Sequence, residues 1–419
     1  MVQLEVKPAW RGAALAEPPA RRARLRRRRQ SGQTLVLGVL TLAVLVGFLG
    51  VGIDFGLARH QQQVLQTVAD SAAIGGAAEL QYNDVSAGAQ KAAALNNFVD
   101  GAGGATLTVN NPPLSGPHAG NAQYVEVIAA LAQPTYFLNL FHISSLNLSA
   151  RAVAYLGNGP GCLYALDPSA AGALRLNGAF NIQVQCGVFV DSSSNQALIA
   201  NGSGSLIAKS VGVAGDALQN GVVTVSPAPQ TGMAPVNDPL GYLTPPSTAG
   251  SCSSPTVVNG SGTVTLQPGV YCSTLILNGN PNVTFAAGTY VLEHGMVMNG
   301  NPTVTGSGVT FYNAAGSLTF NGTTGSNLSA PTTGAYAGIL VYQSPADAAA
   351  LTLNGNNNAT LNGAIYVPGG NIVINGNAAV GAYSIMVADT ITVNGSDSLN
   401  DDFSSLPAGS PVKAPVLVE

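Results

Sequence analysis

The dipeptide Asn-Gly recurs from residue 177 onward at a nearly constant spacing. Successive copies often lie 19 to 22 residues apart, typically beside runs of β-branched residues. A repeat of this length is typical of a solenoid, in which each repeat buries its apolar face against its neighbours. The copies begin at Asn177, Asn201, Asn220, Asn259, Asn278, Asn299, Asn321, Asn354, Asn362, Asn375 and Asn394.

The residues of the repeat favour a β-solenoid. A leucine-rich repeat needs a recurrent Leu-x-x-Leu-x-Leu frame, which the chain lacks. A parallel β-helix needs short strands joined by tight corners, where Asn and Gly tolerate the left-handed backbone. Segments such as 351–353 and 391–393 have apolar side chains at alternate positions, as strands do. We therefore predict a right-handed parallel β-helix over residues 161–402, with stacked Asn side chains forming an amide ladder. Asn-Gly hairpins in a β-sandwich are the alternative.

The four cysteines fit such a solenoid. Cys162 and Cys186 are 24 residues apart, and Cys252 and Cys272 are 20 apart, so each pair spans about one coil. Three pairings are formally possible, and the spacing favours these two disulfides. Neither pair has the spacing of a zinc site. Residues 226–255 contain seven prolines and interrupt the period, which predicts an excursion from the solenoid.

A long apolar run near the N-terminus predicts a membrane anchor. From Thr34 and Leu35 to Ile53 there is no charged residue, and Asp54 follows. At about 1.5 Å per residue this run spans the ~30 Å hydrocarbon core of a bilayer. A cleaved signal peptide and a buried core helix are the alternatives. We expect the anchor to occupy residues 31–56.

The distribution of charge predicts the orientation of this anchor. Nine of the fifteen basic residues precede the apolar run, whereas 17 of the 19 acidic residues lie at or after Asp54. By the positive-inside rule, we expect a single-pass protein of the cytoplasmic (inner) membrane. Its basic tail, residues 1–30, would lie in the cytoplasm, and the chain after the anchor would be exported. An acidic exported part argues against nucleic acid as a partner. The basic residues that set this orientation, which we call the topology signal, end in Arg26, Arg27, Arg28 and Arg29.

Between the anchor and the solenoid the sequence predicts two further parts. Residues 57–100 have the pattern of a helical stalk, which Gly75-Gly76 or Asn83-Asp84 would bend or split. Residues 101–160 contain three alternating segments and a Pro134 suited to starting a short helix, which predicts a small α+β unit. Residues 403–419 are expected to form a C-terminal tail.

The residues around the anchor resemble a known family. The apolar run follows Ser31-Gly32 and closes on Asp54 and Gly56, and the helix then carries Ala69-Asp70-Ser71-Ala72-Ala73. This combination resembles the N-terminal domain of TadE/TadG-like Flp pilus-assembly proteins, in which an Asp closes the span and an Ala-Asp-x-Ala-Ala element follows. Pseudopilins of that system have a Glu where this chain has Leu37, so the chain is more similar to the uncleaved TadG-like member.

The resemblance implies a non-enzymatic component of Flp (tight adherence) pilus assembly. Its partners would be the lipid bilayer and other pilus-assembly proteins, and the β-helix would present a surface to the envelope or to a glycan. A cell-surface adhesin or carbohydrate-binding protein with a borrowed anchor is the second hypothesis. A β-helix enzyme acting on glycans is the third.

The polar residues of the solenoid predict no catalytic, cofactor or metal site. Glu293 and His294 are adjacent in a strand and should face opposite sides. TadG-like proteins often carry a metal-binding Asp-x-Ser-x-Ser element, but the stretch that begins at Asp191 has Asn195 at its last position. The acidic residues Asp397, Asp401 and Asp402 could bind a hard cation such as calcium, although a solvated loop is the default reading.

Overall fold

The computed structural model describes residues 33–321, 327–355, 360–377 and 383–419. They divide into two units, 33–61 with 133–146 and 62–132 with 147–419. The predicted topology signal, Arg26 to Arg29, and the motif residue Gly32 lie outside the described residues.

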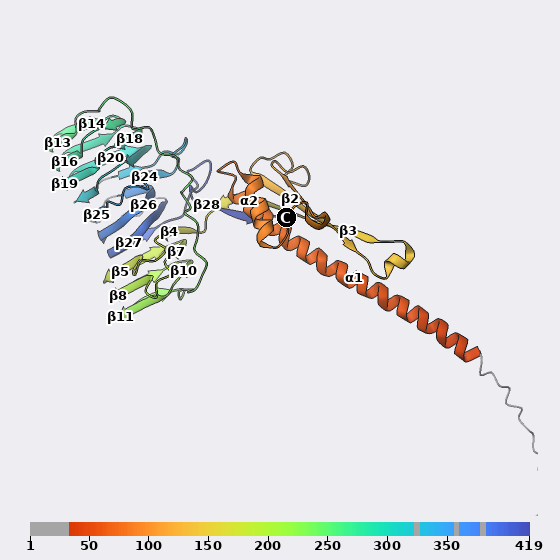
Figure 1. Ribbon diagram of the computed structural model, residues 1–419. Helices are drawn as coiled ribbons and strands as arrows, with labels where there is room; N and C mark the ends of the chain where they lie inside the picture. Colours follow the sequence, from red (N-terminus) through yellow and green to blue (C-terminus); the bar gives the residue numbers. More distant parts are fainter. Residues whose placement is uncertain (1–32, 322–326, 356–359, 378–382) are drawn as a thin grey trace, which may run out of the picture. The chain divides into compact units, whose positions relative to one another are not determined.

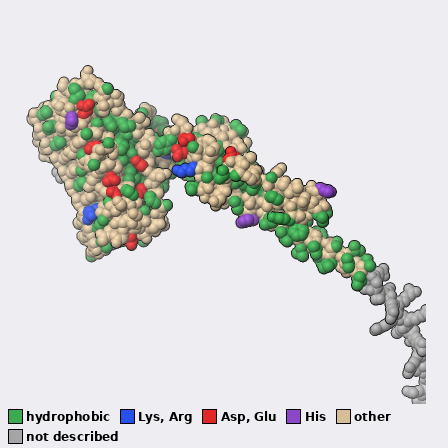
Figure 2. Space-filling model, in the orientation of Figure 1, with side chains coloured by type: hydrophobic (Ala, Val, Ile, Leu, Met, Phe, Trp, Pro, Cys, Tyr) green, Lys and Arg blue, Asp and Glu red, His purple; other side chains and the backbone are tan. Residues whose placement is uncertain are grey.

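The first helix, α1 (Gln33–Ala78), contains the predicted anchor. Its 46 residues extend for about 69 Å at ~1.5 Å per residue. It is long and apolar enough to cross a membrane, and apolar side chains from Leu35 to Ile53 are mostly exposed (Figure 2). Helix α2 (Val85–Leu95) follows a break at which Asn83 has φ +58°. The predicted split at Asn83-Asp84 is therefore present.

Helices α1 and α2 pack on a small four-stranded sheet. Its order is β1 (Thr106–Asn110), β2 (Tyr124–Pro134), β3 (Ser145–Asn158) and β28 (Lys413–Leu417). Two short 3-10 helices, η1 (Ala102–Gly104) and η2 (Leu138–Phe141), precede β1 and β3 respectively. The expected stalk and the expected α+β unit share one core, in which Leu65 and Val68 of α1 are buried beside Val125 and Val127 of β2.

The sheet is completed from a distant part of the sequence. Strand β28 lies within the segment expected to be a C-terminal tail, and it pairs antiparallel with β3, Lys413 opposite Asn158. The solenoid is thus inserted, in sequence, between two neighbouring antiparallel strands. This insertion brings Gly159 and Val412 together, because the Gly159 N–H donates to the Val412 carbonyl at 2.9 Å.

The inserted segment is a β-solenoid of about ten turns, as predicted (Figure 1). Its strands pair in parallel, which rules out the alternative of Asn-Gly hairpins. They stack into three columns, and the long strands β26 (Thr360–Asn377) and β27 (Ser384–Leu399) turn corners to contribute to more than one column.

The remaining strands of the three columns have the following bounds. The first column contains β15 (Gly269–Tyr271), β18 (Gly288–Leu292), β21 (Val309–Asn313), β24 (Ile339–Gln343), β4 (Gly161–Ala165), β7 (Gly187–Val190) and β10 (Ser210–Val213). The second contains β13 (Val257–Gly260), β16 (Leu275–Gly279), β19 (Met296–Gly300), β22 (Leu318–Asn321), β25 (Leu351–Gly355), β5 (Leu174–Gly178), β8 (Leu198–Gly202) and β11 (Ala217–Gly221). The third contains β14 (Thr263–Leu266), β17 (Asn282–Phe285), β20 (Thr303–Ser307), β23 (Asn327–Ser329), β6 (Asn181–Val184), β9 (Ser205–Ile207) and β12 (Thr224–Ser226).

The coils are not stacked in the order in which the chain makes them. The chain enters at β4 in the middle of the stack and reaches one end at β12. It then crosses to the other end, starts again at β13 and returns coil by coil until β27 pairs with β4, β5 and β6. The two runs of coils therefore meet at the β27–β4 junction and form one continuous solenoid (Figure 1).

The crossing segment, residues 227–256, corresponds to the proline-rich excursion expected over 226–255, and we call it the strap. Leu240 and Leu243 of the strap are buried against the solenoid core. The hydroxyl of Tyr342 donates to the Leu243 carbonyl at 2.9 Å, and that of Tyr366 donates to the Asp238 carboxylate at 2.5 Å. The strap is therefore fixed along the solenoid.

The predicted amide ladder is present and crosses the junction. Along it the Nδ2 of one asparagine donates to the Oδ1 of the asparagine in the neighbouring coil, at 2.6 to 3.3 Å. The glycines after eight of these asparagines adopt φ between +81° and +158°, which explains the Asn-Gly pair. From end to end, the described ladder contains Asn259, Asn278, Asn299, Asn321, Asn354, Asn375, Asn394, Asn177, Asn201 and Asn220.

Candidate functional site

The motif residue Asp54 binds the turn between β2 and β3. Its carboxylate accepts hydrogen bonds from the backbone N–H groups of Tyr136, Phe137 and Leu138, at 2.9, 2.8 and 2.7 Å. Asp54 is consequently 2% exposed, although its neighbours on α1 are open. The carboxylate closes the apolar run and at the same time holds a segment more than 80 residues away in sequence.

The same turn covers a glycine of α1. A Cβ added to Gly50 would lie 2.4 Å from the Phe137 ring, so this close contact requires glycine. Gly56, in contrast, would meet no described atom within 4 Å. Gly56 is the motif glycine that the structure describes, and its surroundings give no packing reason for a glycine at this position.

The second motif aspartate, Asp70, lies on the part of α1 that packs on the sheet. Its carboxylate accepts a hydrogen bond from Gln66 Nε2 at 2.7 Å, and the same nitrogen lies 3.3 Å from the Arg151 carbonyl of β3. Asp70 itself is partly exposed. Gln66 therefore connects the aspartate to the sheet.

The alanines of the motif have a packing role. Ala69, Ala72 and Ala73 are fully buried in the core that α1 forms with the small sheet. Small side chains at these positions allow the helix to approach the strands closely. The Ala-Asp-x-Ala-Ala element thus places a partly exposed carboxylate on a helix whose opposite face is packed against the sheet.

Residues 32–79 include both aspartates and these alanines. They match the family described as putative Flp pilus-assembly TadE/G-like. This match agrees with the resemblance of the motif residues, and we call the matched stretch the TadE/G-like segment. No curated protein and no solved structure gave a match to the chain.

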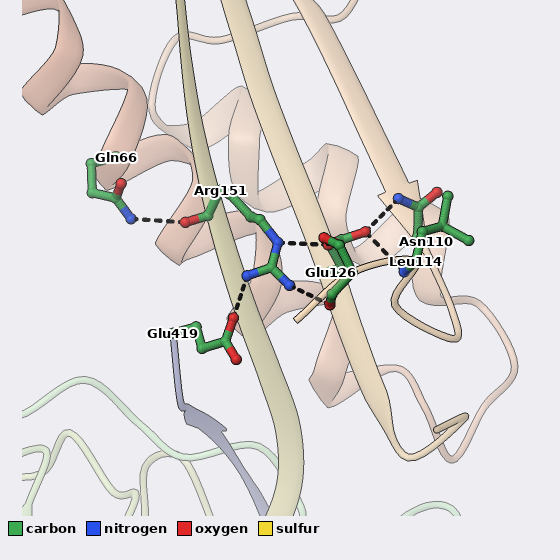
Figure 3. A network of polar contacts seen from close by, with 7 residues as sticks. Gln66, Asn110, Leu114, Glu126, Arg151 and Glu419 are labelled. Atoms are coloured by element: carbon green, nitrogen blue, oxygen red, sulfur yellow. Dashed lines mark hydrogen bonds and ion pairs between the residues drawn. The ribbon is translucent and has the colours of Figure 1, made fainter. Parts of the chain in front are cut away.

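A polar network lies in the sheet that the TadE/G-like segment covers (Figure 3). Glu126 of β2 is buried, and Arg151 Nε of β3 donates to its carboxylate at 2.6 Å. Arg151 also pairs with the Glu419 carboxylate and donates to the Ser115 carbonyl at 2.8 Å. The network therefore joins two strands of the sheet to the segment that follows β28.

The Glu126 carboxylate is held in its charged form. Burial disfavours the charge, but hydrogen bonds from Arg151, Asn110, Leu114 and Ser115 outweigh burial and lower its pKa to about 2. The sequence analysis did not single out these residues. The sequence did contain a signal for them. Glu126 is the one acidic residue in the strand pattern at 124–128, and Arg151 is the one basic residue in the pattern at 146–154. Isolated charges in half-buried strands need partners.

Two disulfides join Cys162 to Cys186 and Cys252 to Cys272, the pairs that the coil spacing favoured. Their Cα atoms are 5.7 and 5.4 Å apart. The first links neighbouring coils, since β4 and β7 pair directly. The second links the end of the strap to the coil that contains β15.

Three of the other polar candidates, Asp191, Asp401 and Asp402, have structural partners. The Asp191 carboxylate accepts a hydrogen bond from Val236 of the strap at 2.9 Å, and burial raises its pKa. Lys209 pairs with Asp401 at 2.7 Å, and the Asp402 carboxylate accepts the Ser404 N–H at 3.1 Å. Within the described ranges, His, Cys, Asp and Glu form no group of three or more able to hold a metal ion.

Proposed function

We propose that this protein is a membrane-anchored, non-enzymatic component of Flp pilus assembly. The observation that carries the proposal is the TadE/G-like segment, whose two aspartates lie on one long helix with an apolar first half. Asp54 and Glu126 are engaged in structural hydrogen bonds, which supports an assembly role for this region over a catalytic one. In this proposal, other pilus-assembly proteins contact the exposed side of the segment around Asp70.

The proposed orientation places the N-terminus in the cytoplasm and the solenoid outside it. The run of arginines before α1 supports this orientation by the positive-inside rule. The two disulfides also support it, because disulfides persist mainly outside the reducing cytoplasm. Protease added to intact spheroplasts should then digest the loops of the solenoid and leave an N-terminal epitope protected.

The test is a count of surface filaments by electron microscopy in a strain that lacks the protein. The null strain should lose filaments, and the full-length chain should restore them. A second complementing variant replaces residues 160–411 by Asn-Gly. This excision is designed from the structure, since Gly159 and Val412 are already paired and a two-residue turn suits neighbouring antiparallel strands.

Each outcome assigns a role to a part of the chain. Restoration by the excised variant would make the anchor and the small sheet sufficient for assembly, and the solenoid a binding surface. Failure of the excised variant, with normal protein level, would make the solenoid necessary for assembly. Normal filament number in the null strain would refute the proposal. A glycan-array signal from the full-length protein would then favour an adhesin.

A further inference from the structure

The turn between β2 and β3, residues 135–143, is apolar and exposed, and we call it the tip. Five large apolar or aromatic side chains are open there, with Leu140 82% and Phe141 64% exposed. The tip contains no Asp, Glu, Lys or Arg. The exposed side chains are Tyr136, Phe137, Leu140, Phe141 and Ile143. A soluble surface rarely gathers such side chains without something to cover them.

The position of the tip along α1 indicates which surroundings would cover its apolar side chains. From Leu35 to Asp54 the helix rises about 29 Å, close to the thickness of a hydrocarbon core. Asp54 binds the tip backbone at the end of this span. Phe137 packs on Gly50, which lies about 6 Å further into the apolar span. Figure 1 shows the turn between β2 and β3 alongside α1.

The backbone of the tip is suited to an apolar surrounding. At membrane depth, N–H groups outside regular helix must find partners within the protein. At least seven of the nine tip residues have a bonded N–H. Those of 136, 137 and 138 donate to Asp54, those of 140, 142 and 143 donate to carbonyls of the same turn, and that of 135 donates to the adjoining Ser144 carbonyl. This arrangement gives a physical reason for a carboxylate at the end of the apolar run.

We propose that the tip inserts into the lipid leaflet nearest Asp54, beside α1, and gives the protein a second contact with the bilayer. The inference rests on the proposed function only in that α1 must span the membrane. Lipid is the occupant that the structure favours, because the exposed apolar side chains of the tip continue the exposed apolar face of α1 at the same depth. Tyr136 then lies at the interface, where its ring and hydroxyl are both accommodated.

The test measures the depth of single tryptophans in the full-length protein. Trp10→Phe removes the one native tryptophan, and Phe141→Trp then reports on the tip. The protein is reconstituted in vesicles of phosphatidylethanolamine and phosphatidylglycerol, with or without bromine on the acyl chains. Leu42→Trp, in the middle of the apolar run and 63% exposed, is the reference for lipid. Val222→Trp, on the solenoid and 83% exposed, is the reference for water.

We expect brominated lipid to quench Phe141→Trp nearly as strongly as Leu42→Trp and to leave Val222→Trp unchanged. Adding Leu140→Asp to the Phe141→Trp protein should abolish most of this quenching, because a carboxylate resists burial in lipid. Leu140 is exposed, so its replacement leaves the packed core intact.

Three results would overturn the inference. Emission from Phe141→Trp like that of Val222→Trp would place the tip in water. Blue-shifted emission without quenching by brominated lipid would show that another protein surface, such as a second copy of this chain, covers the tip. In both cases quenching of Leu42→Trp would leave the anchor intact. An unquenched Leu42→Trp would instead refute the membrane-spanning helix, and the tip insertion with it.

Discussion

Replacing Glu126 by Gln should destabilise the small sheet by removing the charge at the centre of its polar network. The side chain of Glu126 is 1% exposed, and its two oxygens accept four hydrogen bonds. A glutamine retains one acceptor oxygen but turns an amide group toward donors such as Asn110 Nδ2 and the Leu114 N–H. Arg151 keeps its pair with Glu419, so it is not left alone.

The size of the effect follows from these contacts. Removing one partner of a buried ion pair costs about 3–5 kcal/mol. Because Arg151 is 28% exposed and retains a second carboxylate, we expect a cost at or just below the lower limit of this range, about 2–3 kcal/mol. The pKa of Glu126 gives a slightly larger figure, since a fall from 4.5 to about 2 corresponds to about 3.5 kcal/mol at ~1.4 kcal/mol per pH unit.

The same pKa sets the pH dependence. Because folding lowers the pKa of Glu126, its stabilisation is complete above the unfolded value of 4.5 and is lost as pH falls toward about 2. Glu126→Gln should therefore be less stable than wild type at neutral pH, and the difference should shrink across this acid window.

The assay is guanidinium unfolding followed by near-ultraviolet circular dichroism, repeated from neutral to acid pH. Asp401→Asn is the matched control, because it breaks an ion pair with Lys209 whose side chains are 29% and 66% exposed. Surface pairs contribute at most about 1 kcal/mol. An equal loss in both variants, or a Glu126→Gln difference that persists unchanged to pH 2, would refute the reasoning.

Two further substitutions test the solenoid. In thermal unfolding, Gly202→Ala should lose about 2 kcal/mol or more of stability beyond the loss caused by Gly178→Ala. Both glycines have positive φ, but only a Cβ at Gly202 would lie 2.3 Å from a carbonyl oxygen of the neighbouring coil. Equal losses would argue against the close stacking of the coils. Tyr366→Phe removes the hydroxyl that donates to Asp238, so the strap should be cleaved faster in limited proteolysis than in wild type, and an unchanged rate would show that its other contacts suffice.

The parts of the fold that follow from local chemistry were predictable. Asn-Gly pairs at a 19 to 22 residue period specify a corner with positive φ and a ladder of amides, and Cys252 and Cys272 fall one coil apart for the same reason. The TadE/G-like motif likewise identified Asp54. The hydrogen-bonding partners of Asp54 could not be predicted from the sequence. They are backbone N–H groups of residues 136–138, and backbone groups have no sequence signature.

The order of the coils was hidden for a different reason. Every coil presents the same Asn to its neighbours, so the sequence is compatible with stacking in chain order. The observed order depends on the strap, which is long enough to cross the stack, and on the fit of β27 against β4, β5 and β6. The pairing of β28 with the small sheet could not be predicted from the sequence either, because it depends on where the chain leaves the solenoid.

Substitutions along the ladder distinguish the two orders. Asn299 lies within the stack and has ladder bonds to both neighbouring coils, whereas Asn259 lies at one end and has a bond to Asn278 alone among the described asparagines. At about 0.5–1.5 kcal/mol per bond, Asn299→Ala should cost about twice as much as Asn259→Ala in chemical unfolding. All three asparagines compared here, including Asn394, are exposed, which makes the series well matched.

Asn394 is the decisive member of this series. In chain order its coil would be the last one and would have a single neighbour, so Asn394→Ala would resemble Asn259→Ala. In the structure Asn394 bonds to Asn375 on one side and Asn177 on the other. We therefore expect Asn394→Ala to match Asn299→Ala. A solenoid behaves as a row of coils coupled to nearest neighbours, so a cost at the level of Asn259→Ala would mean that the β27–β4 junction does not form in solution.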